Sequence, residues 1–406
     1  MFLRTRFLLW LMAIVASLLT ACSSSGNGEE PVPEDEMAEC TVMIYMVADN
    51  NLSWYATEDL KEMKAGMAKV TTSNVHLLVY IDTGDTPRLV ELVNKDGTVT
   101  ERIIKTYETR NSCGAAEMQE VMDDLKGNKS LIAKKYGFIF WSHGEGWIPF
   151  SSQASTRWIG QDTHPGTHYM EIADLVAFYS NYPKMEFVLF DACFMLSMEV
   201  AYALRDQVNY VIGSPTETPG PGADYEELVP AIMKGGDDMA IQVARAFYEP
   251  YEAIYDGGLS NSDVNWTAGV SIGAIKTDGL SQLASLTKQL LAHVTEVPAD
   301  LRKTVFNYDK RELASPILFV GYYDTVELMQ QLLSSEDFST WKAAYDAVLP
   351  YWKTTPKNYS SHVKLFSMER ANGITHYIPR SDRVKAAESY RQTDWYKDAG
   401  LSQLGW

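Results

Sequence analysis

The sequence contains few cysteines, four among 406 residues. Small secreted scaffolds held together by disulfide bonds carry a far higher share, so that class is excluded. Cys40 and Cys113 could pair in an oxidising compartment, but their positions in the sequence leave this pairing open. The other two, Cys22 and Cys193, lie in patterns that indicate separate roles.

Basic residues are scarce relative to acids. The chain has 35 lysines and arginines against 53 aspartates and glutamates, for a formal net charge of −18. This balance argues against binding to nucleic acid or to anionic lipid surfaces, and it would attract cationic substrates. An acidic surface also keeps an exported protein soluble, so the charge alone does not select a function.

Long apolar runs are absent beyond the amino terminus. There, Arg4 and Arg6 precede the apolar run Phe7–Leu19, and the Leu-Thr-Ala-Cys sequence ending at Cys22 resembles a bacterial lipoprotein signal. We predict a signal peptide over residues 1–21 and a lipid on Cys22. An ordinary secretory signal and an uncleaved anchor are the alternatives, but the run is short for a span of about 20 residues.

The composition predicts one large globular region behind a tether. Residues 22–39 are acidic and have no apolar periodicity, which is typical of a flexible linker. The chain as a whole is 46% hydrophobic and 12% aromatic, as in a globular protein. We expect a main domain over residues 40–280, a smaller C-terminal α+β subdomain over residues 281–406, and a monomer. The predicted location is the bacterial cell envelope, at the outer membrane or cell surface.

Apolar strands alternate with amphipathic helices along the main domain, which predicts an α/β fold with a mainly parallel central sheet. Expected strands cover residues 41–48, 76–81, 138–141, 187–190, 209–214 and 267–275. Expected helices cover residues 53–70, 115–126, 169–179, 225–234, 239–248 and 280–294. An antiparallel hairpin is expected over residues 88–107. In the subdomain we expect helices over residues 325–333 and 340–351 and a hairpin that joins residues 363–368 to 374–378.

One expected strand ends in a cysteine. The apolar run Phe187–Phe190 leads into Asp191 and Cys193, and helical spacing begins at Met195. A cysteine at a sheet's carboxyl edge and close to a helix amino terminus is favoured as thiolate, which suits a nucleophile. Most single cysteines are small buried hydrophobic residues, and taken alone Cys193 is better explained in that way.

A second strand has the same design and carries a histidine. The run Phe138–Trp141 leads into a glycine-bracketed turn that holds His143. If the two strands are parallel neighbours, both turns emerge at the carboxyl edge, where open α/β sheets bind ligands. The histidine precedes the cysteine by roughly 50 residues, which is the caspase-type order. The loops that follow the first two strands also carry Asp and Asn at this edge.

Together these residues could perform thiol-based peptide cleavage. Cys193 would attack, His143 would transfer the proton, and the backbone N–H groups of Cys193 and Gly144 would stabilise the oxyanion. The sequence selects no third residue, although a backbone carbonyl could orient His143. Asp191 would act as counter-ion for a basic substrate side chain, or would instead form the turn or cap a helix. The Pro- and Gly-rich loop 215–225 would form a substrate wall, and the polar loop 148–167 would lie over the site.

Three motifs carry a resemblance to a known family: Trp-Ser-His-Gly-Glu-Gly-Trp at residues 141–147, Phe-Asp-Ala-Cys-Phe-Met-Leu-Ser-Met-Glu-Val-Ala-Tyr at 190–202, and Ser-Pro-Thr-Glu-Thr-Pro-Gly-Pro-Gly-Ala-Asp-Tyr at 214–225. In this order and spacing they resemble the clostripain family of cysteine peptidases, in the caspase-like clan with gingipains and legumains. The resemblance extends from about residue 41 to 280, and more weakly to the end.

This resemblance implies a caspase-like three-layer α/β/α sandwich and cleavage after Arg or Lys by a dyad of His143 and Cys193. It also implies that Asp191 lies in the primary specificity pocket, with Asp224 as a second, weaker candidate. Family members often cut themselves in the loop after the histidine strand, where Arg157 is the candidate here. The chemistry requires no cofactor or metal, although some members need calcium.

Four residues depart from the family pattern. Phe194 and Leu196 are bulkier than the Leu and Gly usual after the nucleophile, which predicts an altered pocket shape. Ser142 and Glu145 differ around the histidine, and Glu145 is expected to alter substrate preference or the basicity of His143.

Three other readings compete. Gly269–Gly273 matches the serine-hydrolase elbow, but Ser271 lies inside the expected strand instead of at its end. A metal hydrolase could use five side chains, but Pro165 and Gly166 break any helix that would align the last two; the five are His143, Glu145, Asp162, His164 and His168. A non-catalytic surface lipoprotein could use the fold to bind peptides or glycans, but the presence of both His143 and Cys193 favours an enzyme.

Overall fold

The computed structural model describes residues 32–34, 36–148, 158–258, 266–313 and 321–406. Residues 37–406 form one compact unit. The predicted signal peptide, the predicted lipid attachment at Cys22 and the predicted self-cleavage at Arg157 lie outside the described residues. Within the described part of the chain, no helix combines the length and the apolar character needed to cross a membrane.

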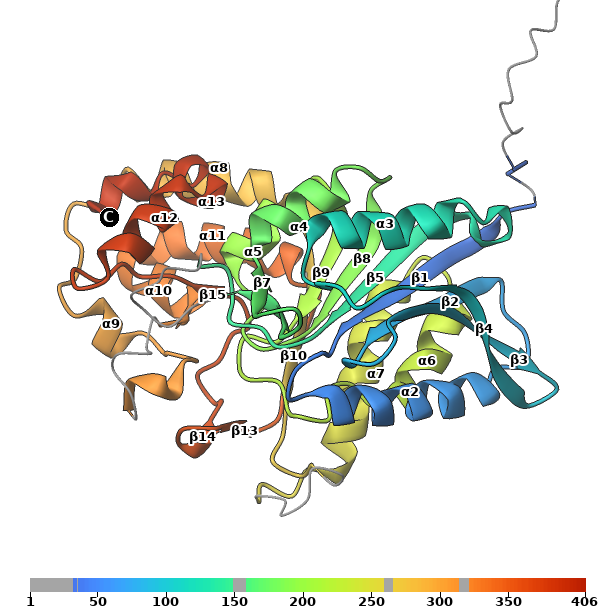
Figure 1. Ribbon diagram of the computed structural model, residues 1–406. Helices are drawn as coiled ribbons and strands as arrows, with labels where there is room; N and C mark the ends of the chain where they lie inside the picture. Colours follow the sequence, from blue (N-terminus) through green and yellow to red (C-terminus); the bar gives the residue numbers. More distant parts are fainter. Residues whose placement is uncertain (1–31, 35, 149–157, 259–265, 314–320) are drawn as a thin grey trace, which may run out of the picture. The chain divides into compact units, whose positions relative to one another are not determined.

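A nine-stranded sheet forms the centre of this unit, in the order β12-β10-β9-β8-β5-β1-β2-β3-β4 (Figure 1). Its strands are β1 (Ala38–Val47), β2 (Val75–Asp82), β3 (Arg88–Lys95), β4 (Thr98–Thr106), β5 (Ala133–Trp141), β8 (Met185–Asp191), β9 (Val208–Gly213), β10 (Ser271–Lys276) and β12 (Tyr351–Thr354). Neighbouring strands from β2 through β9 pair in parallel, whereas β3 and β10 run against their neighbours. The mainly parallel sheet is therefore confirmed.

Helices cover both faces of the sheet and complete a three-layer sandwich (Figure 1). On one face lie α2 (Ser53–Ala68), α6 (Tyr225–Lys234) and α7 (Met239–Ile254). On the other lie α3 (Ala115–Lys126), α4 (Ile172–Tyr179), α5 (Met198–Ala203) and α8 (Leu280–Leu291). Alternate residues of each strand enter the two cores, so that Tyr45 packs with α3 and Ile44 with α2. Continuous apolar strands arise because both faces are buried.

The expected hairpin over residues 88–107 is present and extends the sheet. Strands β3 and β4 pair around Asp96 and Gly97, whose φ angles are +53° and +84°. Two adjacent positive φ angles match the twist of a two-residue hairpin, and glycine adopts one of them without steric cost. The hairpin thus forms the edge of the central sheet.

The C-terminal segment is mixed and shares the main sheet through β12. Its helices are α9 (Leu301–Thr304), α10 (Thr325–Leu332), α11 (Ser335–Val348), α12 (Val384–Gln392) and α13 (Asp394–Asp398). Its short strands are β11 (Tyr323–Asp324), β13 (Lys357–Ser360), β14 (Lys364–Ser367) and β15 (Thr375–His376). Short 3-10 helices are η1 (Lys129–Leu131), η2 (Thr277–Gly279), η3 (Lys310–Leu313) and η4 (Leu401–Leu404). The predicted division at residue 280 stays a prediction within this one unit.

The predicted hairpin between residues 363–368 and 374–378 is wrong. Strand β14 pairs with β13, and β15 pairs with β11. The Asn372-Gly373 pair, which suggested a hairpin turn, instead binds the residue that caps α10. The backbone N–H of Asn372 donates to Asp324 at 2.7 Å, and its side-chain amide donates to the same carboxylate at 3.1 Å. Because Asp324 caps α10, this turn holds the start of a helix.

Candidate active site

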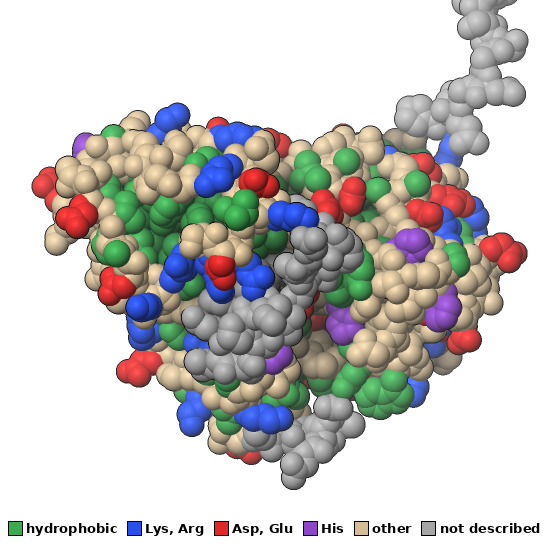
Figure 2. All heavy atoms as spheres, turned by 60° about the vertical axis from the view of Figure 1, so that its left-hand side comes forward, with side chains coloured by type: hydrophobic (Ala, Val, Ile, Leu, Met, Phe, Trp, Pro, Cys, Tyr) green, Lys and Arg blue, Asp and Glu red, His purple; other side chains and the backbone are tan. Residues whose placement is uncertain are grey.

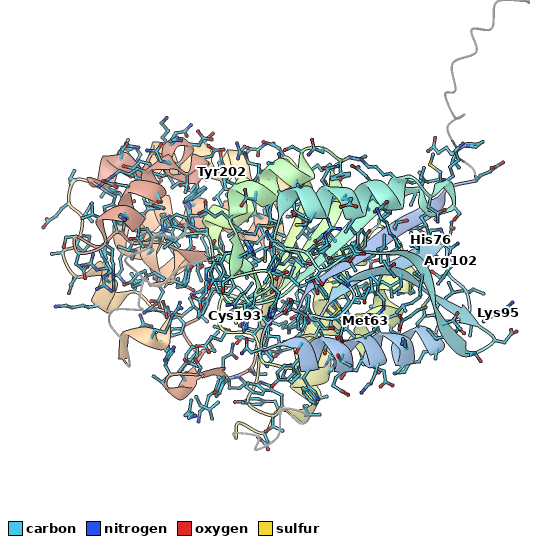
Figure 3. All side chains as sticks on the ribbon, in the orientation of Figure 1. Met63, His76, Lys95, Arg102, Cys193 and Tyr202 are labelled. Atoms are coloured by element: carbon cyan, nitrogen blue, oxygen red, sulfur yellow. The ribbon has the colours of Figure 1, made fainter. Side chains whose placement is uncertain are left out.

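The two strand ends that carry His143 and Cys193 meet at one edge of the sheet. Strands β5 and β8 are parallel neighbours, and their register places Trp141 opposite Asp191. His143 and Cys193 each lie two residues beyond this pair. A Cβ added at Gly144 would stand 2.8 Å from the carbonyl oxygen of Cys193, so the two loops touch and glycine is required. In Figure 3, Cys193 lies at the opposite end of the strands from His76 and Arg102.

Cys193 is half-buried and contacts the loop after β9. The backbone N–H of Thr218 donates to its Sγ at 3.2 Å, and the carbonyl oxygen of Thr218 lies 3.8 Å away. Burial raises the pKa of Cys193 to about 12, and the charges of Glu217 and Glu145 act in the same direction. The thiol is therefore protonated at neutral pH in this conformation, and it needs a base to become a nucleophile.

The imidazole of His143 has the chemistry of such a base. Burial lowers its pKa below the ordinary value, although the charge of Glu145 opposes the change. Its Nε2 lies 2.6 Å from Oδ1 of Asn51, which can only accept a hydrogen bond. Nε2 must therefore carry the proton in the neutral ring. The free lone pair is then on Nδ1, which is the atom available to accept a proton.

The sequence did not single out Asn51 as a site residue. It belongs to the Asp-Asn-Asn loop after β1, which the sequence had placed at the carboxyl edge. The neighbouring Asn50 holds this loop, because its side-chain amide donates to the carbonyls of Val47 and Gln161, and its Oδ1 accepts the N–H of Leu52. Asn51 thereby occupies the orienting position that had been left to a backbone carbonyl.

Replacing Asn51 with alanine should lower kcat by about 10- to 100-fold, part of the ~10²–10⁴-fold contribution typical of acid–base catalysis, because the imidazole loses its orienting acceptor. Steady-state kinetics on an arginine peptide measures this loss. Asn51→Asp is the matched control, since it keeps the acceptor and adds a charge. It should retain more activity and raise the pKa of the acidic limb. A wild-type kcat in Asn51→Ala would exclude the orienting role.

Asp191 lies beneath the loop after β9. Only 4% of the residue is exposed. Its Oδ2 accepts from the N–H of Ala223 at 3.0 Å and from the hydroxyl of Tyr225 at 3.1 Å. Its Oδ1 is buried and has no hydrogen-bond partner in the described part of the chain. Burial raises the pKa of Asp191 to about 6, whereas these two donors lower it.

Two more acids lie near Asp191. Asp59 accepts from the indole N–H of Trp141 at 2.7 Å, and its pKa is raised by burial and by the charge of Asp191. Glu62 accepts from the N–H of Tyr225 at 3.2 Å, and burial raises its pKa to about 7. Among the described residues, the contacts of these three carboxyls include no cation, so the region under the loop can attract a basic side chain.

Asp224, the second candidate for the specificity pocket, caps α6. Its carboxylate accepts from the backbone N–H of Glu227 at 3.2 Å. Burial raises its pKa. The cap explains why an acid stands here, and a further role in substrate binding stays a prediction.

Because Asp224 caps α6, its contribution to stability can be measured separately from the effect of its charge. Asp224→Ala should lower the free energy of unfolding by about 1 kcal/mol, because α6 loses its N-cap. Asp224→Asn should leave stability nearly unchanged, since asparagine caps equally well. Denaturant unfolding of the three proteins measures both. Equal destabilisation by the two substitutions would assign the effect to the charge instead.

The structure excludes Ser271 as a hydrolase nucleophile. It is the first residue of β10 instead of following a strand, it is 1% exposed, and its hydroxyl bonds to Ser214 at 3.1 Å and to Asn358 at 2.8 Å. Gly273 of the same motif has a packing role, because a Cβ there would stand 2.6 Å from Cδ2 of Leu196. The bulky Leu196 is thus accommodated by a glycine, and the elbow pattern is coincidental.

The residues of the metal-hydrolase reading do not converge. His164 pairs with Asp49 at 2.8 Å, His168 with the carbonyl of Pro165 at 2.9 Å, and Asp162 accepts from the N–H of Ser112 at 2.7 Å. Among the residues that the structure describes, no three His, Cys, Asp or Glu side chains are grouped to hold a metal ion.

The open pairing of Cys40 and Cys113 is also resolved. Both cysteines are buried and free. Cys40 lies in the core shared with α2, and Cys113 lies in the core on the other face of the sheet. The sheet separates them, so they do not form a disulfide bond.

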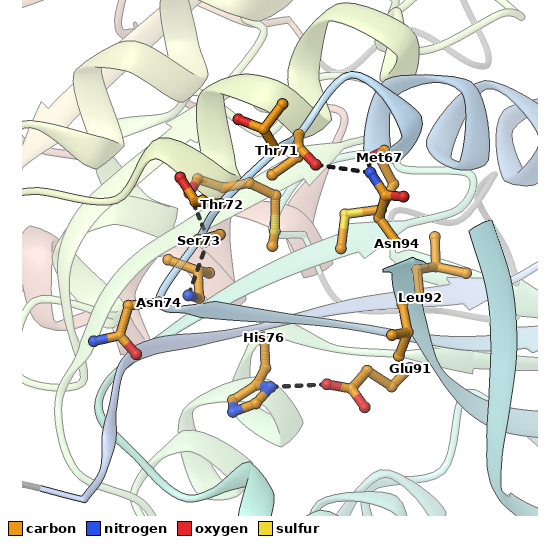
Figure 4. A pocket seen from close by; sticks show the side chains of 13 residues that line it. Met67, Thr71, Thr72, Ser73, Asn74, His76, Glu91, Leu92 and Asn94 are labelled. Carbon is orange, nitrogen blue, oxygen red and sulfur yellow. Dashed lines mark hydrogen bonds and ion pairs between the residues drawn. The ribbon is translucent and has the colours of Figure 1, made fainter. Parts of the chain in front are cut away.

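Two surface features lie apart from this edge. A cavity of about 220 Å³ opens at the start of β2, where His76 pairs with Glu91 at 2.8 Å (Figure 4). It is lined by threonines, asparagines and apolar side chains, at the opposite end of the strands from Cys193.

On the face drawn in Figure 2, acidic and basic side chains are interspersed. The predicted absence of nucleic-acid binding remains a prediction.

A parallel sheet that presents a cysteine and a histidine from adjacent strand ends is the arrangement of an α/β cysteine peptidase. The chain belongs to the Clostripain family (Peptidase_C11), whose profile matches residues 44–404. The family resemblance drawn from the sequence motifs is thus confirmed, as is the enzyme class.

Individual proteins that resemble this chain are also cysteine proteases of this family. Clostripain of Hathewaya histolytica is 24% identical, over 90% of this chain and 80% of its own. A secreted C11 cysteine protease of Bacteroides thetaiotaomicron, solved with an irreversible peptide inhibitor, is 36% identical with a TM-score of 0.81, covering 90% of this chain and 99% of the other. An inactive zymogen C11 protease of Parabacteroides distasonis is 28% identical with a TM-score of 0.75, covering 91% of this chain and 99% of its own.

Proposed function

We propose that this protein is an exported, lipid-anchored cysteine endopeptidase that cleaves after Arg or Lys with Cys193 as nucleophile and His143 as base and acid. The observation that supports it most is the contact between the two strand-end loops, in which Gly144 packs on the backbone of Cys193. Adjacent parallel strands place a thiol and an imidazole at one edge of the sheet. These two groups are the nucleophile and the base that thiol-based peptide cleavage requires.

The geometry suggests the following steps. Nδ1 of His143 takes the thiol proton as the sulfur of Cys193 forms a bond to the scissile carbonyl carbon. The oxyanion accepts from the N–H groups of Cys193 and Gly144. In the β-bridge between Gly144 and Ile159, the carbonyl of His143 accepts from Gly160 and the N–H of Glu145 donates to Trp158. The N–H of Gly144 takes no part in these two hydrogen bonds. His143 then protonates the leaving amine, and water hydrolyses the thioester with the same imidazole as base.

Specificity for a basic side chain is supported by Asp191. Its buried Oδ1 has no hydrogen-bond partner among the described residues, and an arginine or lysine of the substrate would supply one. The nearby carboxyls of Asp59 and Glu62 would add to the attraction. Asp224 is a second candidate at the edge of the same loop.

Activation and location are parts of the same proposal. Self-cleavage near Arg157 would convert a zymogen, and a related C11 protease from Parabacteroides distasonis is described as an inactive zymogen. Export is supported by relatives described as secreted, and attachment through a lipid on Cys22 by the signal pattern. We expect calcium to be dispensable for the chemistry, and assays with and without a chelator would test this.

The experiment is hydrolysis of fluorogenic peptides with Arg, Lys or a neutral residue before the scissile bond, with and without iodoacetamide. We expect thiol-dependent turnover of the Arg and Lys peptides. The protein is tested as purified, after trypsin nicking and with added calcium. If none of these gives thiol-dependent turnover, the alternative applies, in which the peptidase fold binds peptides or glycans without cleaving them.

A further inference from the structure

Two of the four residues that depart from the family pattern contact the same side chain. Arg311, in η3 of the C-terminal segment, forms an ion pair with Glu145 through Nη1. Its guanidinium also lies 4.8 Å from the ring centroid of Phe194. Glu145 is two residues beyond His143, and Phe194 directly follows Cys193. One cation therefore touches both strand-end loops.

Arg311 is itself held rigidly. Its Nε donates to Oδ1 of Asp309 at 2.6 Å, and its Nη2 donates to Oδ2 of the same carboxylate at 3.0 Å. The side chain of Arg311 is 8% exposed and that of Asp309 is fully buried. A two-point carboxylate contact fixes the plane of a guanidinium, and lysine cannot reproduce it.

Tyr322 reinforces the same arrangement. Its hydroxyl donates to the carbonyl of Glu145 at 2.5 Å, and its ring stacks on Phe194 with centroids 5.2 Å apart. Gly146 has a φ of +88°, and a Cβ there would stand 1.8 Å from the tyrosine oxygen. Only glycine allows the loop after β5 that carries His143, the histidine loop, to approach Tyr322 this closely.

The backbone after the nucleophile is in an unusual conformation. Phe194 has a φ of +60°, in the left-handed region that bulky residues rarely adopt. Such a conformation persists only where the surroundings impose it. Here the ring is fixed by Arg311 and Tyr322, and the N–H of Phe194 donates to the carbonyl of Thr216 at 2.9 Å.

We propose that Arg311 is a positioning residue that fixes the histidine loop against the cysteine loop by contacting Glu145 and Phe194 at once. This inference rests on the proposed function. Among the described residues, the charged and titratable groups on or against the two loops include His143 and Glu145 on one loop, Cys193 on the other, Glu217 after β9, and Asp309, Arg311 and Tyr322 from the C-terminal segment. Of these, Glu145 raises the pKa of His143, and Arg311 neutralises Glu145.

The test is Arg311→Met, which keeps much of the side-chain length and removes the charge and the two-point contact. We expect kcat to fall by about 10- to 100-fold with KM nearly unchanged, as for a small misplacement of catalytic groups. The pKa of the acidic limb of the pH–rate profile should rise by roughly 0.5–1 unit, because Glu145 is no longer neutralised. Arg311→Lys should recover the pKa but only part of kcat.

A double variant separates the two effects. In Arg311→Met with Glu145→Gln, the acidic limb should return to the wild-type position or below, while kcat stays low. Tyr322→Phe keeps the ring and loses only the bond to Glu145, so it should show a smaller loss of kcat. All rates are expressed per active site titrated with an irreversible thiol reagent, which removes any contribution from unfolded protein.

The outcomes are distinct. A wild-type kcat per titrated site and an unshifted acidic limb in Arg311→Met would overturn the positioning role. So would a loss of melting temperature with no change in either quantity. Failure of the proposed function would instead be visible in the wild-type protein, which would show no thiol-dependent turnover at all.

Discussion

Replacing Cys193 with alanine should reduce kcat/KM on arginine and lysine peptides by at least ~10⁴-fold, the scale on which removal of a nucleophile acts in other hydrolases. Cys40 offers a matched control, because it is a buried free cysteine in the core beyond the active edge. Cys40→Ala should keep full turnover and full sensitivity to iodoacetamide.

The same substitution also tests self-cleavage. In Cys193→Ala, a cut near Arg157 should no longer form during incubation of the purified protein, as followed by gel electrophoresis and mass spectrometry. A cut that persists would mean that a different protease makes it. Turnover that persists in Cys193→Ala would remove this cysteine from the mechanism.

Asp191→Asn should lower kcat/KM for arginine and lysine peptides by about 30- to 1,000-fold, because one partner of a buried charge pair is removed. Peptides with a neutral residue at the same position should be cleaved at an unchanged rate. Asp224→Asn removes the charge of the second candidate and keeps the helix cap, so the comparison of the two variants shows which carboxylate binds the basic side chain. Equal losses on basic and neutral peptides would exclude Asp191 from the specificity pocket.

The pKa of Asp191 adds a pH dependence to this prediction. Burial raises it to about 6, and only the ionised carboxylate attracts a cation. KM for an arginine peptide should therefore fall as pH rises through about 6, and KM for a neutral peptide should not. The dependence should disappear in Asp191→Asn, because the amide does not titrate.

The sequence predicted the features that depend on local pattern. Continuous apolar runs gave the strands β1, β5 and β8 because a strand buried on both faces needs no polar residue. The loops that follow these strands had to lie at one edge once the sheet was parallel. Topology alone therefore places His143 and Cys193 at the same edge of the sheet.

The features that were missed depend on contacts between distant segments. Asn51 orients His143 across 92 residues, and Arg311 reaches Glu145 across 166. Neither residue type carries a signal for such a partner. The Asn372-Gly373 pair misled in the same way, because the two amides of Asn372 bind Asp324, 48 residues away. Local turn chemistry was correct there, but a tertiary contact decided what the turn joins.

Labelling by a reactive arginine peptide tests most directly whether Cys193 and His143 act together on substrates with a basic residue. The protein is treated with an arginyl chloromethyl ketone, and the site of attachment is mapped by mass spectrometry. We expect one adduct per molecule, on Cys193, lost in His143→Ala and reduced in Asp191→Asn. An adduct on another residue, or equal labelling by a matched neutral peptide reagent, would contradict this expectation.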